Sequence, residues 1–429
     1  PGSLIEEVVA LAIRAPSSMN SQPWHLHVIT GEPLDLVLDL GRQPLGNGFL
    51  TDTTSEEYFY SLQCGFSESS RLFQLMEQPE PSLMFHQNYA FFSSTSVRMI
   101  EHFKAFADSL IGRGYIGQPE SFIVELGSND GIFLCNFAAK GIAHLGVEPS
   151  GTVADMSEQQ GVRVIRGFFD RSLAESILSE HGPADVITAA NVLCHIPDLQ
   201  ELMCGVDLLL KENGVLIFED PYLGDVIRLG SYDQIYDEHV FLFSALSVQA
   251  IFDTVGMELI NLEPQSTHGG SMRYTLGRKG RHAPKTIVKE LLSAETAQGL
   301  DRTSTYHEFA ARVADSARQL REALEKLKQD GRAIAAYGAT SKSTTIYNYA
   351  GIGPDHIDFI CDNSPTKIGK LSPGVHIPIV AEEHFRTNPP DVAFLAAWNH
   401  EREVREHNVA FEIGGGRWLA HVPKVRLLD

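Results

Sequence analysis

A segment that begins at residue 125 combines acidic residues and glycines in the pattern of a ligand-binding turn. An apolar run ending at Leu126 predicts a strand, and a glycine-containing polar turn leads from it into a predicted helix. Glycine allows a positive φ angle and a close approach of the backbone to a ligand, and a helix N-terminus presents unpaired N–H groups. We therefore interpret this segment as a cofactor-binding turn. Its candidate contact residues are Glu125, Gly127, Asn129, Asp130 and Gly131.

Glu148 stands at the end of the next predicted strand, where a partner for this turn is expected. A carboxylate has enough acceptor sites to bind both hydroxyl groups of a ribose. The glycine spacing is not GxGxxG, so it does not predict a site for a dinucleotide pyrophosphate. The alternative is a plain turn without a ligand, and the position of Glu148 favours a cofactor.

Three later segments carry side chains that suit removal of a proton next to a carbonyl group. A histidine has a pKa near neutrality, a neighbouring carboxylate can orient it, and tyrosine or histidine donors can stabilise an enolate oxygen. Loops that follow parallel strands line one crevice, so we expect these segments to converge. The structural alternatives are a turn cap for His195, a surface pair for Glu238 and His239, and a core position for Tyr236. The candidates are Asn191, His195, Tyr222, Tyr236, Glu238 and His239.

The elements that position these residues are apolar runs alternating with helical stretches. This alternation indicates the α/β class, with a parallel sheet covered on both faces. Residues 4–14 predict a helix, 24–30 and 34–40 predict short strands, and 285–330 predict a long charged helical spacer. A second, smaller α/β unit begins at residue 331. The strands predicted for the two units are 122–126, 143–147, 162–166, 184–190 and 214–219, and then 333–337, 357–361 and 392–396.

The composition is that of a globular, acidic protein. Apolar residues make up 43% of the chain and charged residues 21%, which excludes a disordered chain. The formal net charge of −21 repels nucleic acids and anionic lipids, and no long apolar run predicts a membrane span. Five cysteines without a CxxC motif, and a start that lacks a signal-peptide pattern, favour the reducing cytoplasm. We therefore predict a cytoplasmic protein with no nucleic-acid or membrane partner.

Ordered sequence blocks carry a resemblance to a known family. From about residue 36 to the C-terminus the chain contains, in this order, VELGSNDGIFL, LGVEPS, ANVLCHIPDL, FEDPYLGDVI, YDQIYDEHVFLFSALSVQ, STHGGSMRYTL, AAYGATSKSTT and LAAWNH. These blocks resemble the C3-methyltransferases of antibiotic deoxysugar biosynthesis, such as those for tetronitrose and mycarose. Those enzymes use S-adenosylmethionine (SAM) and release S-adenosylhomocysteine.

The resemblance implies three domains and a substrate. A small N-terminal domain is expected over residues 1–100, and a central class I methyltransferase domain with a Rossmann-like fold over 101–284. A helical spacer and a C-terminal Rossmann-like substrate domain are expected over 285–429. The implied substrate is a dTDP-linked 4-keto-deoxysugar. The oligomeric state stays open, and a monomer agrees with the sequence.

The resemblance also implies roles for individual residues. Family members are thought to remove the C3 proton next to the 4-keto group, after which the enolate carbon takes the methyl group. By motif position His239 is the base. The other implied catalytic residues are Tyr89, His195, Tyr236 and Glu238, and the implied substrate contacts are Asn191, His195, Tyr222, His268, Arg273 and Lys342. For Lys342 two roles stay open, a contact to the nucleotide diphosphate and closure of the cleft.

The N-terminal segment departs from the family pattern. The family usually carries two cysteine pairs that bind a structural zinc, but the second pair falls on Ser67 and Ser70 here, and Cys64 lies outside the pattern. Serine is a poor zinc ligand compared with a thiolate, so we predict neither zinc nor another metal. Stoichiometric zinc in the purified protein would contradict this. The segment APSSMNSQPW instead resembles the start of flavin-dependent nitroreductases, and we expect it to stabilise the domain by apolar packing.

Two other function classes are the alternatives. One is an NAD-dependent nucleotide-sugar oxidoreductase or epimerase, for which Gly112, Gly114 and Gly117 supply a GxGxxG string. That string precedes a predicted strand instead of following one, and the chain has no YxxxK motif. The other is a non-catalytic relative, against which the intact motif residues speak.

Overall fold

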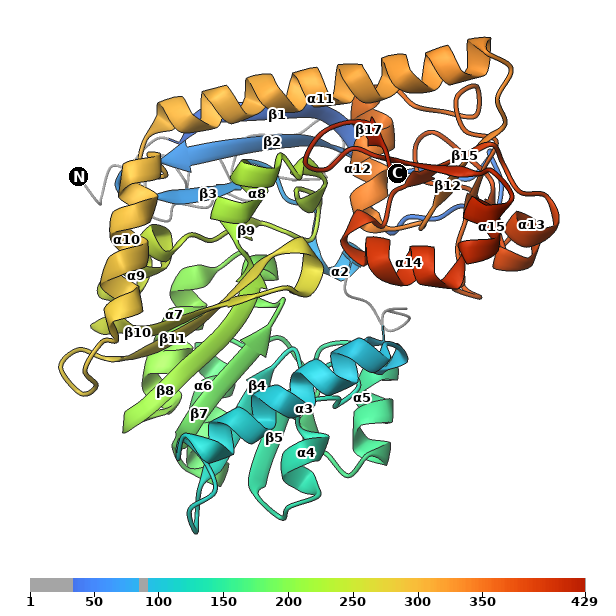
Figure 1. The fold of residues 1–429 in the computed structure, drawn as a ribbon. Helices are drawn as coiled ribbons and strands as arrows, with labels where there is room; N and C mark the ends of the chain where they lie inside the picture. The colour runs from blue at the N-terminus through green and yellow to red at the C-terminus, as the bar shows by residue number, and fades with distance from the viewer. Residues whose placement is uncertain (1–33, 85–91, 429) are drawn as a thin grey trace, which may run out of the picture.

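The computed structural model describes residues 34–84 and 92–428. It contains three sheets connected by helices (Figure 1). Their strand orders are β1-β2-β3-β9 for the N-terminal sheet, β10-β11-β8-β7-β4-β5-β6 for the central sheet and β14-β13-β12-β15-β16-β17 for the C-terminal sheet. The predicted α/β class is confirmed. The predicted elements at 4–14 and 24–30, and Tyr89, lie outside the described residues.

The strands alternate with helices through the central and C-terminal parts. The N-terminal sheet contains β1 (Asp35–Pro44), β2 (Phe59–Ser67), β3 (Leu72–Leu75) and β9 (Phe241–Leu242). The central sheet contains β4 (Phe122–Leu126), β5 (Ala143–Val147), β6 (Val164–Ile165), β7 (Ala184–Ala190), β8 (Leu210–Pro221), β10 (Met257–Gln265) and β11 (Ser271–Arg278). The C-terminal sheet contains β12 (Ile334–Tyr337), β13 (Phe359–Cys361), β14 (Ile379–Val380), β15 (Val392–Leu395), β16 (Arg417–Ala420) and β17 (Arg426–Leu427).

The helices lie between these strands and on their faces. The α-helices are α2 (Pro81–Met84), α3 (Val97–Gly112), α4 (Cys135–Ala138), α5 (Gly151–Gln159), α6 (Arg171–His181), α7 (Leu199–Leu209), α8 (Leu223–Leu229), α9 (Ala245–Asp253), α10 (Thr286–Gln298), α11 (Thr303–Gln329), α12 (Ser341–Ala350), α13 (Glu382–Thr387), α14 (Glu401–His407) and α15 (Val409–Ile413). Short 3-10 helices are η1 (Ser93–Thr95), η2 (Leu193–His195), η3 (Tyr232–Gln234), η4 (Thr267–Gly269) and η5 (Trp398–His400).

The central sheet has the strand order expected of a class I methyltransferase. Strands β6, β5, β4, β7 and β8 run parallel, whereas β11 is inserted antiparallel between β8 and β10. Strands β4, β5 and β7 have the predicted bounds. Strand β8 starts earlier than the predicted 214–219 because an irregularity in its pairing with β7 lets Leu210 pair with Ala184. The charged residues before Gly214 do not predict a strand, so the sequence did not indicate this pairing.

The predicted helical spacer consists of two helices, α10 and α11, separated at Gly299. Gly299 caps the C-terminus of α10 in the left-handed conformation, with a φ of +77°, which glycine adopts without strain. Helix α11 runs along β1 and β2 (Figure 1). Its Tyr306 ring lies 4.2 Å from the Phe66 ring, measured between centroids. A single hydrophobic cluster joins residues of the N-terminal sheet, α11 and the C-terminal sheet, so these parts share a core.

The GxGxxG string precedes a strand, as predicted, and lies between α3 and β4. Gly112 ends α3, and Gly114 and Gly117 form the connection to β4 with positive φ angles. None of the described helices is both long and apolar enough to cross a membrane.

Candidate active site

The predicted cofactor turn follows β4 and packs tightly against its neighbours. Gly127 has a φ of +63°, and a Cβ atom there would lie 2.4 Å from Val192. Gly131 has a φ of +81°, and a Cβ atom there would lie 2.6 Å from the Ser157 hydroxyl on α5. Both positions therefore require glycine, for backbone conformation as well as for space.

Glu148 connects the end of β5 to this turn. One of its carboxylate oxygens accepts a hydrogen bond from the Asn129 amide at 2.9 Å, and the other accepts one from the Ser150 amide at 2.8 Å. Burial raises the pKa of Glu148, and these two hydrogen bonds oppose that effect. Each oxygen keeps acceptor capacity, as contact with two ribose hydroxyl groups requires.

Several buried polar atoms around the turn lack a hydrogen-bond partner among the described residues. They are Glu125 Oε2, Ser128 Oγ and Asp130 Oδ1. Burial and then the charges of Glu148 and Asp130 raise the pKa of Glu125. Because unpaired buried polar groups are costly, these atoms fit a bound ligand that brings a cationic amine and hydroxyl groups, as SAM does.

The short helix η1 closes over the same turn. The Ser93 amide donates to Asn129 Oδ1 at 3.1 Å, and the Ser94 amide donates to Asp130 Oδ2 at 2.9 Å. The chain that enters α3 is therefore tied to the cofactor turn.

The second group of candidates is centred on a reverse turn over residues 236–239, which we call the catalytic turn. The His239 amide donates to the Tyr236 carbonyl at 3.0 Å. The Tyr236 hydroxyl lies 2.9 Å from His239 Nε2, and His239 Nδ1 lies 2.7 Å from the Gln234 carbonyl oxygen. A carbonyl oxygen only accepts, so Nδ1 carries the ring proton and Nε2 holds the lone pair, to which the Tyr236 hydroxyl donates.

Burial keeps the histidines of this site neutral. It lowers the pKa of His239 well below the ordinary value, and the nearby His195 and Lys342 side chains oppose a second positive charge on His239. Burial also lowers the pKa of His195 to about 4. The two rings stack with their centroids 5.3 Å apart. His239 therefore has a free-base Nε2 at neutral pH, as a general base needs.

Glu238 does not have the orienting role that its neighbouring position suggested. Its Oε1 accepts a hydrogen bond from Asn47 Nδ2 at 2.8 Å, and the Gln234 carbonyl orients the His239 ring instead. Burial, together with the charge of Asp237, raises the pKa of Glu238. The carboxylate is thus directed toward the N-terminal part of the chain.

Asp220, which the sequence analysis did not single out, holds the loop that carries His195. Its carboxylate accepts hydrogen bonds from the Val192 amide at 3.1 Å, the Cys194 amide at 3.0 Å and the Cys194 thiol at 3.3 Å. Asn191, which precedes Val192, has a φ of 54°. Its main-chain N–H donates to the main-chain carbonyl of Glu219 at 2.7 Å. In the sequence, only its position as an acidic residue at the end of a predicted strand could have indicated this role.

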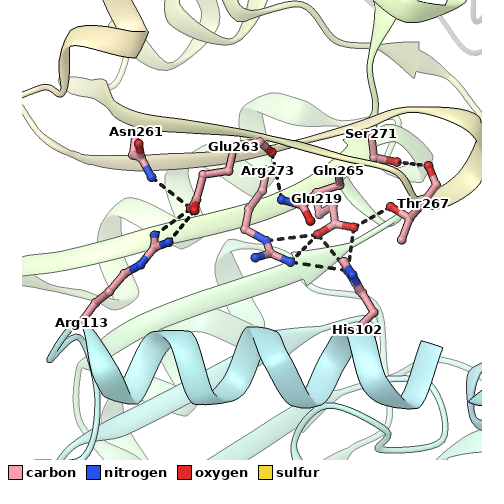
Figure 2. Close-up of polar contacts among 9 residues, drawn as sticks. All are labelled: His102, Arg113, Glu219, Asn261, Glu263, Gln265, Thr267, Ser271 and Arg273. Carbon is pink, nitrogen blue, oxygen red and sulfur yellow. Dashed lines mark hydrogen bonds and ion pairs between the residues drawn. The ribbon is translucent and has the colours of Figure 1, made fainter. Parts of the chain in front are cut away.

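Two residues predicted to contact the substrate, Arg273 and Tyr222, have buried partners within the protein. Arg273 donates to Glu219 from Nε at 3.1 Å and from Nη2 at 2.8 Å (Figure 2). Its guanidinium carbon lies 3.7 Å from the centre of the Phe106 ring. The Tyr222 hydroxyl donates to Glu295 on α10 at 2.8 Å. Both side chains therefore make structural contacts, and their contact with a substrate stays a prediction.

Glu219 is the centre of this buried network, which connects β8, β11, η4 and α3 (Figure 2). His102 Nε2 lies 2.9 Å from its Oε1, and the Thr267 hydroxyl donates to it at 2.9 Å. Burial alone would raise the pKa of Glu219. The hydrogen bond from His102 and the charge of Arg273 outweigh burial and lower the pKa to about 2.

Lys342 and His268 meet next to the catalytic turn. Lys342, at the start of α12, donates to the His268 carbonyl at 3.2 Å, and Gln234 donates to the same oxygen. Burial lowers the pKa of Lys342 to about 8 and that of His268 to about 3. Trp398 Nε1 donates to Asp233 at 2.7 Å. The C-terminal part therefore reaches the segment that precedes the catalytic turn.

Neither group of possible metal ligands fits a metal site. Over residues 34–84 and 92–428, one set of three possible ligand atoms lies close together, those of Cys194, His195 and His239, within 4.8 Å of one another. However, both His239 nitrogens and the Cys194 thiol make the hydrogen bonds described above. Where the family usually binds zinc, the hydroxyl groups of Ser67 and Ser69 are hydrogen-bonded to each other at 3.0 Å. The Cys64 side chain nearby is fully buried. Residues 34–84 contain one cysteine and no histidine, so they do not supply a zinc ligand set.

Comparisons with known proteins agree with this architecture. Family models match in three successive regions, a "Putative zinc binding domain" at 29–85, a "Methyltransferase domain" at 99–262 and a "C-methyltransferase C-terminal domain" at 266–423. The C-methyltransferase NovU of Streptomyces niveus is 30% identical over 92% of this chain and 94% of its own length. A SAM-dependent methyltransferase structure from Anabaena variabilis aligns with a TM-score of 0.33 at 16% identity, over 41% of this chain and 84% of its own. We draw no conclusion from this low similarity.

A second curated relative is of another kind. The 4-nitrobenzoate reductase of Pseudomonas putida is 57% identical over 30 residues, which are 7% of this chain and 13% of the reductase. This match is of the nitroreductase type that the N-terminal segment resembles, and it is too short to assign a function. The long match to NovU and the ordered domain models decide the family: the chain belongs to the C-methyltransferases.

Proposed function

We propose that this C-methyltransferase transfers the methyl group of SAM to C3 of a dTDP-linked 4-keto-deoxysugar. The observation that carries the proposal is the Tyr236–His239 pair, in which a buried neutral imidazole is oriented through Nδ1 and keeps the Nε2 lone pair. The substrate class is supported by the sequence blocks shared with deoxysugar C3-methyltransferases. The name of the relative NovU supports the reaction type.

The chemistry follows from the acidity of a carbon next to a ketone. His239 Nε2 accepts the C3 proton, and the Gln234 carbonyl stabilises the resulting imidazolium through Nδ1–H. The Tyr236 hydroxyl, released from Nε2, donates to the enolate oxygen that develops from the 4-keto group. Bound SAM supplies a methyl group electrophilic enough to need no further activation. The chain has to hold the base, the carbon and the methyl group in line and keep water out.

A product assay across a panel of dTDP-4-keto-deoxysugars tests the proposal. With SAM we expect one member to gain a single methyl group by mass, placed at C3 by NMR. In deuterated water and S-adenosylhomocysteine, the same sugar should exchange its C3 proton. If all sugars stay unmethylated, or if the methyl group appears on oxygen or nitrogen, the proposal is wrong. Binding of NAD in place of S-adenosylhomocysteine would favour the oxidoreductase alternative.

Replacing Glu148 by alanine should weaken cofactor binding. The change removes the carboxylate proposed to bind the ribose, and hydrogen bonds to a charged group contribute about 1.5–3 kcal/mol, or about 10- to 100-fold in affinity. Isothermal titration with S-adenosylhomocysteine measures the effect. Glu158→Ala is the matched control, because Glu158 lies nearby on α5 but pairs with Arg166 at the surface. Equal affinity of both variants would move the ribose contact elsewhere.

A further inference from the structure

A turn of the N-terminal sheet lies directly against the catalytic turn. This turn, residues 45–48, follows β1 and is closed by a hydrogen bond from the Gly48 amide to the Leu45 carbonyl at 3.0 Å. We call it the supporting turn. Its contacts are made with residues 237 and 238, which are nearly two hundred positions later in the chain.

Two hydrogen bonds join the two turns. The Gly46 amide donates to Asp237 Oδ1 at 3.0 Å, and Asn47 Nδ2 donates to Glu238 Oε1 at 2.8 Å. Asp237 and Glu238 are the two middle residues of the catalytic turn, and both are buried. Tyr236 and His239 are its first and last residues. Holding the two middle side chains therefore fixes the orientation of the pair that does the chemistry.

The supporting turn is itself held by the C-terminal part. The Thr344 hydroxyl on α12 donates to the Gly46 carbonyl at 3.0 Å. A Cβ atom on Gly46 would lie 2.8 Å from both Asp237 Oδ1 and Ser341 Cβ. Lys367 lies 5.1 Å from the centre of the Phe49 ring and attracts the Glu238 carboxylate. Gly46 therefore stands at a junction with no room for a side chain.

Building on the proposed function, we propose that the supporting turn positions the catalytic turn, with Asn47 as the positioning residue for Glu238. This gives the N-terminal domain a role in methyl transfer that needs no metal. Its hydrogen-bonding groups reach the catalytic turn from a rigid strand end, and the shared core with α11 keeps that strand in place.

The first test needs no substrate. In protein labelled with ¹⁵N-histidine, the signal of His239 is identified by its loss in His239→Asn. We expect Asn47→Ala and Gly46→Ala to shift or broaden this signal, because the ring is no longer held in one position. The matched control is Gln63→Ala, which removes an amide-to-carboxylate hydrogen bond of 2.8 Å to Asp39 at an exposed place in the same sheet. An unchanged His239 signal in both Asn47→Ala and Gly46→Ala would overturn the proposal.

The second test uses turnover of the methyl acceptor found in the sugar panel. We expect Asn47→Ala to lower kcat about 10- to 100-fold, in line with the cost of leaving a buried hydrogen-bond partner unpaired, with unchanged affinity for S-adenosylhomocysteine. In a Glu238→Gln background the same change should cost much less, because the two residues act as a unit. An equal loss in both backgrounds would contradict a positioning role. Failure of the whole sugar panel would refute the proposed function, and the ¹⁵N signal would still decide this inference.

Discussion

Replacing His239 by asparagine should abolish methyl transfer while leaving the cofactor affinity nearly intact. Asparagine can still donate to the Gln234 carbonyl from the position of Nδ1, but it has no atom in place of Nε2. General base catalysis contributes about 10²–10⁴-fold, so we expect kcat to fall by at least about 10²-fold. Exchange of the C3 proton with deuterated water should disappear as well. Both are measured by NMR on the sugar that the wild-type enzyme methylates.

Two controls separate loss of the base from loss of the fold. Affinity for S-adenosylhomocysteine should stay within a few-fold of wild type, because Glu148 and the cofactor turn belong to a different part of the sheet edge. Tyr236→Phe should retain more proton exchange than His239→Asn, since it removes the proposed oxyanion donor but keeps the base. Methyl transfer by His239→Asn within about tenfold of wild type would remove His239 from the mechanism.

Replacing Glu219 by glutamine should cause the largest loss of stability. The change leaves the Arg273 guanidinium buried without its carboxylate, and breaking a buried ion pair costs about 3–5 kcal/mol in the free energy of unfolding. Denaturant unfolding followed by circular dichroism measures it. Glu263→Gln is the matched control, because Glu263 also pairs with an arginine, Arg113, in the same region (Figure 2). That pair is partly exposed, so its loss should cost only about 0–1 kcal/mol.

The stability that Glu219 contributes should decrease as the pH falls. The folded pKa of Glu219, about 2, lies below its ordinary value of 4.5, so the folded protein holds the carboxylate ionised. The stability that the ionised carboxylate contributes is fully present above pH 4.5 and is lost as the pH falls through about 2, below which the folded and the unfolded protein are both protonated at this residue. The difference between wild type and Glu219→Gln should therefore narrow over this range. A difference that stays constant down to pH 2 would contradict the assigned ion pair.

The Glu219 network also has a consequence for the site. Thr267, which donates to Glu219, begins η4, and the next residue, His268, accepts the hydrogen bond from Lys342. The main-chain N–H of Asn191 donates to the main-chain carbonyl of Glu219, so the loop after β7 adjoins the same strand position. Weakening this network should therefore lower activity before it unfolds the chain.

The local pattern of the sequence determined three strands of the central sheet and the turn that follows β4. Strands β4, β5 and β7 are continuous apolar runs that end at polar turns, and such runs are recognisable without any knowledge of their neighbours. The spacing of the glycines and Glu148 was enough to predict that they lie together, which the hydrogen bond from Asn129 to Glu148 confirms. For the same reason the Tyr236–His239 pair was found, since its two members lie within a single turn.

Only the tertiary structure decided which distant groups meet these residues. Asn47 meets Glu238, His102 meets Glu219, and β9 joins the N-terminal sheet across a long stretch of sequence. It also gave Arg273 and Tyr222 buried carboxylate partners where the motifs indicated substrate contacts. Periodicity records which face of an element is buried, but not what lies against that face. Those pairings arise only when elements far apart in the sequence pack together, as the N-terminal sheet, α11 and the C-terminal sheet do around their shared core.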